Sequence, residues 1–483
     1  MNEHLWALSA RELNDGYRRA DFSPTDVTEA VFERIGEHEE AIGAFFTIEK
    51  DRALSQAAEA DARLANGEPL SPLDGIPLSI KDLDDTAGVR TTYGYRGLAS
   101  NVPHRNSVVA ERVQSSGAVM LGKTTTAAFG HQDSSENLLG PITANPYDLS
   151  RSPGGSSAGA AAAAAVGYGP IHLGTDAAGS VRIPGALSGV VGFKPSFGTI
   201  PVWPQRFFHG STVHSGVLAR EVRDVIMAMD VLAGPDYRDP MSHTPSPGSG
   251  YASAARALQA KRSRMAFSYD LGYGQVSPTV WARLSSAIDV LALDGWDVTD
   301  MHPGWADPAR MHDVRWATAM AASHRDMLDR DPDGVDTTLK SMIRQGERYS
   351  GVDVANYLGE RGALVERLNN LFSTGIDFLV TPTMPVTAWP IHSSADQHAD
   401  VKLGDDIFAR SYLCYPFNLT GNPAISVPCG LSEEGLPVGL QIIGRLHDDA
   451  SVLAAATAVQ DSLVAAGLSW TAPVDPRAPL IRS

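Results

Sequence analysis

The stretch at 150–198 restricts the fold of this chain more than any other. Glycine and serine fill 153–159, and six consecutive alanines follow from Ala160 to Ala165. A linker would not continue into an alanine run flanked by small residues, whereas a helix packed closely inside a protein would. Residues 171–198 are again rich in glycine, with apolar pieces between. We therefore expect a buried helix, followed by backbone that turns sharply and approaches a ligand closely.

Helix and strand patterns occur on both sides of this stretch. Residues 23–66 read as helical, with Ser23 as the capping residue. A short apolar run ends at Lys81, and 107–124 reads as a helix, a turn and a strand. Strand patterns return after 376, before an alanine- and valine-rich helix. These patterns favour one interwoven α/β domain over two separate ones.

We predict a single interwoven α/β domain over 1–483. Helices are expected at 1–70. The α/β core is expected at 71–235 and 376–483, and the part between, 236–375, is expected to be variable, mostly helical and to build the substrate pocket.

Composition excludes several classes of function. The formal net charge is −17, from 39 basic and 56 acidic residues, so a nucleic-acid partner is not expected. Two cysteines exclude a disulfide framework. The N-terminus lacks the pattern of a signal peptide, and no apolar stretch is long enough to cross a membrane. We expect a cytoplasmic protein that does not bind membranes.

The motifs leave serine as the candidate reactive group. Metal-binding HExxH and the dinucleotide-binding GxGxxG are absent from the sequence, and the glycine-rich runs at 150–198 lack the P-loop pattern GxxxxGK[ST]. Ser156 and Ser180 both lie on glycine-rich backbone. A serine hydroxyl needs a base to attack a carbonyl, and backbone N–H groups must stabilise the oxyanion that forms. Small residues before Ser180 leave such N–H groups unobstructed.

Eight motifs in a fixed order resemble the amidase signature family. They cover most of the chain except roughly 236–370, and they are Lys81-Asp82, PGGSSAG at 153–159, DAAGSVRIP at 176–184, GFKPSFG at 192–198, SGVLAR at 215–220, VTPTMP at 380–385, NLTGNPAISVP at 418–428 and LPVGLQIIG at 436–444. The resemblance implies an α/β fold with a central mixed twisted β-sheet covered by helices on both faces. It implies an amidohydrolase that cleaves the C–N bond of a small-molecule amide through an acyl-enzyme. It also implies that no metal or cofactor takes part.

The resemblance assigns roles by position. Ser180 matches the nucleophile, Lys81 the base, and Ser156 the serine that follows a cis peptide bond and relays the proton. The family's oxyanion hole falls on the backbone of Ala177, Ala178, Gly179 and Ser180. Gly130 and Ser156 fall at substrate-binding positions. We interpret Ser157, Asp176 and Arg182 as supporting residues that organise the site.

Some positions depart from the family pattern, and two further readings stay open. Alanine at 158, 177 and 178 stands where many relatives have glycine or threonine-glycine pairs, and Ala127-Ala128-Phe129 stands where many have Pro-Glu-Phe. One alternative is the amidase subunit of a tRNA-dependent amidotransferase, against which Ile183 argues because those subunits usually carry glutamine there. The other is a catalytically inactive binding protein on the same scaffold.

Substrate specificity is expected to lie in the least recognisable part of the chain. The candidates for an apolar pocket wall are Trp203, Phe207, Phe208, Trp316 and Met320. Esters and carbamates (urethanes) are further substrate classes that the resemblance allows. The expected partner is the small-molecule substrate, and the sequence leaves a homodimer open.

Overall fold

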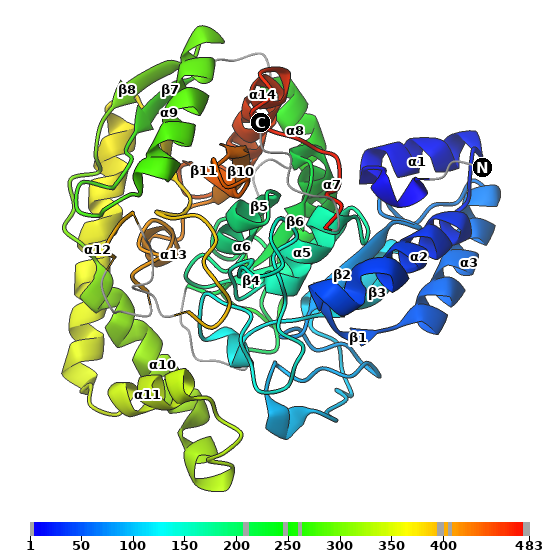
Figure 1. The fold of residues 1–483 in the computed structure, drawn as a ribbon, viewed down its shortest axis with the longest axis horizontal. Helices are drawn as coiled ribbons and strands as arrows, with labels where there is room; N and C mark the ends of the chain where they lie inside the picture. The colour runs from blue at the N-terminus through cyan, green and yellow to red at the C-terminus, as the bar shows by residue number, and fades with distance from the viewer. Residues whose placement is uncertain are drawn as a thin grey trace.

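One large sheet organises the chain. The structure, a computed structural model, describes residues 4–205, 212–244, 250–258, 263–393, 400–403 and 408–476. Its strands pair in the order β1-β3-β2-β4-β6-β5-β10-β11-β9-β7-β8 (Figure 1). The strands are β1 (Phe45–Ile48), β2 (Pro77–Lys81), β3 (Val119–Thr124), β4 (Ile171–Asp176), β5 (Val191–Lys194), β6 (His214–Ala219), β7 (Arg264–Phe267), β8 (Asp297–Asp300), β9 (Phe378–Pro382), β10 (Ala424–Leu431) and β11 (Pro437–Ile443).

The sheet is mixed, as the sequence predicts. Strand β2 runs parallel to β3 and β4, and β7 runs parallel to β8 and β9. The central strands β4, β6, β5, β10, β11 and β9 pair antiparallel in that order. The chain therefore reaches β3 and β4, the two strands beside β2, through crossover connections. The connection between β3 and β4 contains the alanine-rich helix.

Helices make up much of the remaining described chain. The α-helices are α1 (Ala10–Arg19), α2 (Pro24–Ile42), α3 (Lys50–Ala65), α4 (Val108–Ser116), α5 (Ala158–Val166), α6 (Arg182–Leu187), α7 (Val222–Leu232), α8 (Tyr251–Leu258), α9 (Pro278–Leu293), α10 (Ala309–Arg330), α11 (Thr337–Gly346), α12 (Gly351–Ser373), α13 (Pro416–Leu419) and α14 (Asp449–Ala465); short 3₁₀ turns are η1 (Leu5–Ala7), η2 (Arg96–Leu98) and η3 (Ala128–Gly130). None of the helices described is long and apolar enough to cross a membrane. Figure 1 shows α1 to α3 on one side of the molecule and α10 to α12 on the other.

The two faces of the sheet carry different helices. On β6, Leu218 packs with alanines of α5, whereas its neighbour Val217 packs in the cluster that contains α7. Successive side chains of a strand point to opposite faces, so α5 and α7 cover opposite faces. Helix α5 is buried along its whole length. A Cβ atom at Gly159 would lie 2.2 Å from the carbonyl oxygen of Ala44, which explains why this helix needs very small residues.

The N-terminal part differs from the prediction in one respect. Residues 23–66 are not helical throughout, because α2 ends at Ile42, with Gly43 as its C-cap, and β1 lies between α2 and α3. Gly43 adopts the left-handed conformation that commonly ends a helix. The next residues, Phe-Phe-Thr-Ile, suit a pleated strand and pair antiparallel with β3. Pairing at the edge of the sheet therefore overrides the helical pattern there.

Strands also occur in the stretch at 236–375, which the sequence predicts to be mostly helical. The short strands β7 and β8 extend the sheet beyond β9. Helices α9 to α12 make up most of the rest of that stretch. Because β7 and β8 have only four residues each, they leave little periodicity for a sequence pattern to show.

Candidate active site

Two parallel strands bring the predicted lysine and the second serine loop together. Strand β2 ends at Lys81, and its neighbour β4 ends at Asp176, with Ile80 opposite Leu173. The loop after β4 carries Ser180 into α6. The carboxyl ends of parallel strands meet at one edge of a sheet, which is the usual place for a ligand in an open α/β fold.

Lys81 is fully buried and contacts hydroxyl groups. Its Nζ atom lies 2.8 Å from Oγ of Ser156, 2.8 Å from Oγ of Ser157 and 3.1 Å from Oγ1 of Thr175. Burial lowers the pKa of Lys81 from 10.5 to about 7, and the carboxylates of Asp84 and Asp176 oppose part of that effect. A large share of the lysine is therefore neutral near pH 7, and a neutral amine can accept a proton.

Ser156 follows a cis peptide bond and lies against Gly130. The cis bond joins Gly155 to Ser156. Gly130 has a φ of 69°, and a Cβ atom added to it would lie 3.1 Å from Oγ of Ser156. The left-handed conformation and the close approach both favour glycine at this position.

Ser157 links the loops of the two candidate catalytic serines. Its hydroxyl donates to the carbonyl of Thr175 over 3.1 Å, and its backbone N–H donates to the carbonyl of Ser180 over 3.1 Å. The lysine at the end of β2 also donates to this hydroxyl. Ser157 therefore holds the loop before α5 against the loop after β4.

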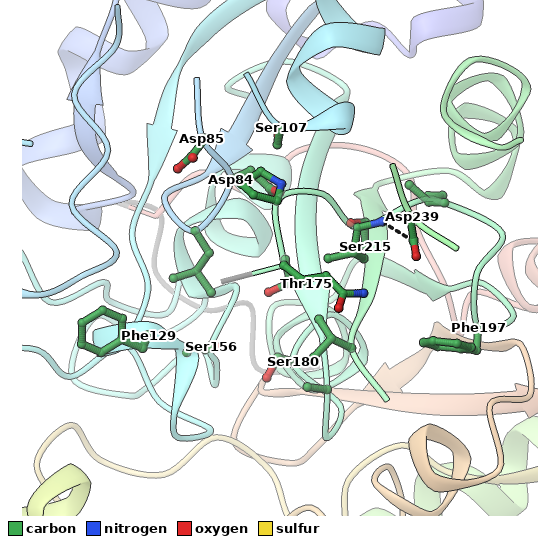
Figure 2. Close-up of a pocket in the computed structure, with 18 of the residues that line it drawn as sticks. Asp84, Asp85, Ser107, Phe129, Ser156, Thr175, Ser180, Phe197, Ser215 and Asp239 are labelled. Carbon is green, nitrogen blue, oxygen red and sulfur yellow. Dashed lines mark hydrogen bonds between the residues drawn. The ribbon is translucent and has the colours of Figure 1, made fainter. Parts of the chain in front are cut away.

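Ser180 lies at the surface of a pocket that Ser156 also lines (Figure 2). Within the described residues, its hydroxyl makes no hydrogen bond, and the side chain keeps 7% of its surface exposed. The N–H of Gly179 donates to Oδ1 of Asp176 over 2.8 Å. Of the four N–H groups that the resemblance assigns to an oxyanion hole, the one of Gly179 therefore has a carboxylate partner already.

A buried ion pair organises the loop. Arg182 donates two hydrogen bonds of 3.0 Å to the carboxylate of Asp176, and neither side chain is exposed. Asn418 and Gln441 accept from the same guanidinium at 2.7 and 2.6 Å. Burial by itself would raise the pKa of the Asp176 carboxyl, but Arg182 holds that pKa well below its usual range. Both partners therefore stay charged, and the pair fixes the start of α6.

Arg315 contacts the same loop from helix α10. Its guanidinium donates to the carbonyl of Ala177 over 3.0 Å and also bonds to the hydroxyl of Thr212. In a trans peptide the carbonyl and the following N–H point in opposite directions. The bond from Arg315 therefore turns the N–H of Ala178 away from the arginine.

The pocket contains about 960 Å³, counting its open mouth. Apolar side chains form much of its wall: Leu83, Phe129, Phe197, Ile200, Val202, Val213 and Trp316. Of the predicted wall residues, Trp316 lines the pocket, and its indole N–H donates to the carbonyl of His131. Figure 2 shows Phe129 near Ser156, and Phe197 at the far side of Ser180.

The other predicted wall residues have different positions. The ring of Trp203 contacts the guanidinium groups of Arg105 and Arg238 at 5.0 and 4.4 Å, and Trp203 is not among the described residues that line the pocket. Met320 is fully buried in a hydrophobic cluster. Phe207 and Phe208 lie outside the described residues.

Sequence reasoning missed several residues that contact the site. Asn418 and Gln441 lie in the motifs quoted above, so their position was a usable signal. No sequence signal marks Thr175, Arg315 and Asp84, because a threonine on a strand, an arginine on a helix and an aspartate in a turn are all common. Among the described residues, no group of three or more histidine, cysteine, aspartate or glutamate side chains has an arrangement that suits a metal ion.

Comparison with known proteins identifies the family of this chain. The family model described as Amidase matches residues 26–453. The chain is similar to an acylamidase of Rhodococcus erythropolis, with 36% identity over 93% of this chain and 94% of the relative. It is also similar to a glutamyl-tRNA(Gln) amidotransferase subunit from Symbiobacterium thermophilum, with 34% identity over 94% of this chain and 96% of the relative.

Solved structures give the same result. A bacterial aryl acylamidase of the amidase signature family superposes with a TM-score of 0.87 and 27% identity, over 94% of this chain and 96% of that chain. A 6-aminohexanoate cyclic dimer hydrolase in complex with substrate gives 0.87 and 25%, over 98% and 100%. With its mixed sheet, its motifs and these relatives, the chain belongs to the amidase signature family of hydrolases that act on amides.

Proposed function

We propose that this protein hydrolyses small-molecule amides, with Ser180 as nucleophile, Ser156 as proton relay and Lys81 as base. The observation that carries the proposal is the 2.8 Å hydrogen bond between a fully buried lysine and Ser156, in the wall of the pocket that Ser180 faces. Lysine with a lowered pKa supplies the base that a serine nucleophile needs.

The first half of the reaction forms an acyl-enzyme. Neutral Lys81 accepts the proton of Ser156, which takes the proton of Ser180 as the Ser180 oxygen bonds to the carbonyl carbon. Backbone N–H groups of Ala177, Ala178 and Ser180 support the oxyanion. The proton then returns through Ser156 to the leaving nitrogen as the C–N bond breaks, and the amine departs neutral.

The second half uses water and reverses these roles. Lysine and Ser156 together take a proton from water as its oxygen attacks the ester carbon. The bond to Ser180 breaks, and the Ser180 oxygen recovers its proton while the carboxylic acid leaves. Esters and carbamates present the same carbonyl and a leaving oxygen or nitrogen, so we include both classes among the candidate substrates.

The apolar wall favours an acyl or aryl group beside the scissile bond. Phe129 and Trp316 line the pocket together with Ser156. Aromatic side chains bury large apolar area against a flat or aliphatic ligand. The relatives named as an acylamidase and an aryl acylamidase support this choice of substrate.

The second candidate function is that of one component of an amidotransferase complex. Several relatives named as glutamyl-tRNA(Gln) amidotransferase subunits are 33–35% identical to this chain. Such a role requires a partner protein, so purification of the tagged protein from its native cells with stoichiometric partners would favour it. We rank it second because such subunits usually carry glutamine at the position of Ile183. Ile183 is buried against Gly154 and Gly179 and offers no polar group there.

The nucleophile can be tested by covalent labelling. A serine-directed sulfonyl fluoride should add one label to the wild-type protein, and mass spectrometry should map it to Ser180. Ser180→Ala should remove the label and lower kcat for an acyl p-nitroanilide by at least about 10⁴-fold. Ser432→Ala, at a buried serine that is not among the described residues lining the pocket, is the matched control and should keep both properties. Full turnover by Ser180→Ala would show that the nucleophile is another residue.

A further inference from the structure

The pocket that contains Ser180 carries negative charge and no described positive charge. Asp84, Asp85 and Asp239 line it, and among the described residues no lysine, arginine or histidine does so. Figure 2 shows Asp84 and Asp85 close to each other, and Asp239 in another part of the pocket. The three carboxylates differ in whether the protein itself satisfies them.

Two of these carboxylates have protein partners. Asp239 accepts backbone N–H groups of Val202 and Met241 at 2.9 and 3.0 Å. Asp85 accepts the hydroxyl of Tyr93 and keeps only 1% of its surface exposed. Both therefore hold the walls of the pocket in place.

Asp84 is different. No hydrogen bond from the described residues reaches its carboxylate, although Oδ2 is buried. The rest of its side chain is partly exposed and lines the pocket. A carboxylate that no protein group reaches needs a partner from outside the chain, which can be water, an ion or a ligand.

The nearby lysines do not pair with this carboxylate. Lys123 donates to the backbone carbonyl of Asp84 and to the hydroxyls of Thr86 and Thr91, which uses all three of its N–H groups. Lys81 donates to hydroxyls and is neutral when it acts as a base. Burial raises the pKa of the Asp84 carboxyl to about 6, and Lys123 opposes that rise, so the group is mostly ionised at pH 7.

We propose that Asp84 forms a subsite for a cationic group of the substrate, so that the preferred substrates are amides that also carry an ammonium or similar cation. This inference rests on the proposed amidase function and specifies its substrate class. The cation would donate to the Asp84 carboxylate from the pocket, where the other two carboxylates, those of Asp85 and Asp239, already have protein partners. A carboxylate-bearing amide would meet three negative groups and be disfavoured.

The test compares substrates of equal shape and different charge. The first pair is the p-nitroanilides of 6-aminohexanoic acid and heptanoic acid, in which an ammonium replaces a methyl group. A second pair places the cation on the amine side, as N-acetyl-1,5-diaminopentane and N-acetylhexylamine. Shorter members of each series locate the distance from the scissile bond to the subsite. We expect kcat/KM to favour the cationic member by about tenfold or more in one of the two series.

Asp84→Asn should bring that ratio to about 1, because the amide has the same shape and no charge. Any effect of Asp84 on Lys81 changes both members of a pair equally and cancels in the ratio. Asp289→Asn, on the exposed side of α9, removes one negative charge elsewhere and should keep the wild-type ratio. Asp84→Ser is a second variant in case the first does not fold. Competitive inhibition by pentylamine relative to pentanol measures the same preference without turnover.

The outcomes separate this inference from the proposed function. Ratios near 1 in both wild-type series, with turnover that still needs Ser180, would overturn the cationic subsite alone. An unchanged cation preference in Asp84→Asn would also overturn it. Turnover that persists in Ser180→Ala would instead overturn the catalytic assignment. A preference that Asp84→Asn and Asp84→Ser both abolish would support the subsite.

Discussion

The acid limb of the pH profile tests the role of Lys81 most directly. Burial lowers its pKa from 10.5 to about 7. At pH 7 about half of the lysine is then neutral, compared with about 0.03% for a lysine with the ordinary value. The neutral form is the one that can accept a proton, so kcat/KM should rise with pH and reach a plateau above about pH 8. At pH 5 it should be about a hundredfold below that plateau.

The assay measures initial rates with a neutral acyl p-nitroanilide, which does not titrate in this range, at constant ionic strength. Enzyme preincubated at each pH and returned to neutral pH controls for unfolding. Asp84→Asn distinguishes an acid limb that reports Lys81 from one that reports the Asp84 carboxyl group. If the limb reports Lys81, removing the Asp84 charge should move it to lower pH, because that carboxylate raises the lysine pKa.

Two results would refute the reasoning. A limb centred near pH 10 would mean that burial does not shift the lysine, which therefore could not serve as a base at neutral pH. A limb near pH 6 that disappears in Asp84→Asn would assign the titration to the carboxyl group, whose pKa is about 6. In either case Lys81 would not act as the base at neutral pH, and that base would have to be found elsewhere.

Three further substitutions test the surroundings of the site. Gly130→Ala places a Cβ 3.1 Å from Oγ of Ser156 and should lower kcat/KM by at least about tenfold in steady-state assays, whereas Gly67→Ala, at a similar φ in open space, should not. Arg315→Met frees the Ala177 carbonyl and should lower kcat more than it raises KM, with partial recovery in Arg315→Lys. Arg182→Met leaves Asp176 buried without its cation and should lower the free energy of unfolding by about 3–5 kcal/mol in urea titrations. A wild-type kcat in Arg315→Met would contradict the second of these predictions, and wild-type stability in Arg182→Met would contradict the third.

The sequence predicted the parts of the site that lie on regular elements. The sequence places Lys81 at a strand end and the alanine run in a buried helix, and β2 and α5 confirm both. The serines follow from the resemblance, because a glycine-serine loop alone has many possible functions. What links them is the parallel pairing of β2 with β4, which a set of motifs does not contain.

The pocket was much less predictable. Trp203 and Trp316 are both tryptophans in weakly recognisable sequence, yet one stacks against arginines and the other lines the pocket. Met320 lies one turn from Trp316 on α10 and is fully buried. Which side of α10 meets the substrate depends on how that helix packs on the sheet, and its apolar residues are too evenly spread to show this. In the sequence alone, Asp84 cannot be distinguished from an ordinary turn residue, because the pocket that it lines is formed by the fold.

A lowered pKa alone does not identify the base in this protein. Burial also lowers the pKa of Lys194 to about 7, with Arg182 adding to that effect. Yet Lys194 donates to the backbone carbonyls of Pro195 and Asn422, and carbonyl oxygens have no proton to give. Lys81 differs because its partners are hydroxyls, one of which lines the pocket with Ser180. Proton transfer needs a partner that can lose a proton, so the choice between the two lysines is made by what each one touches.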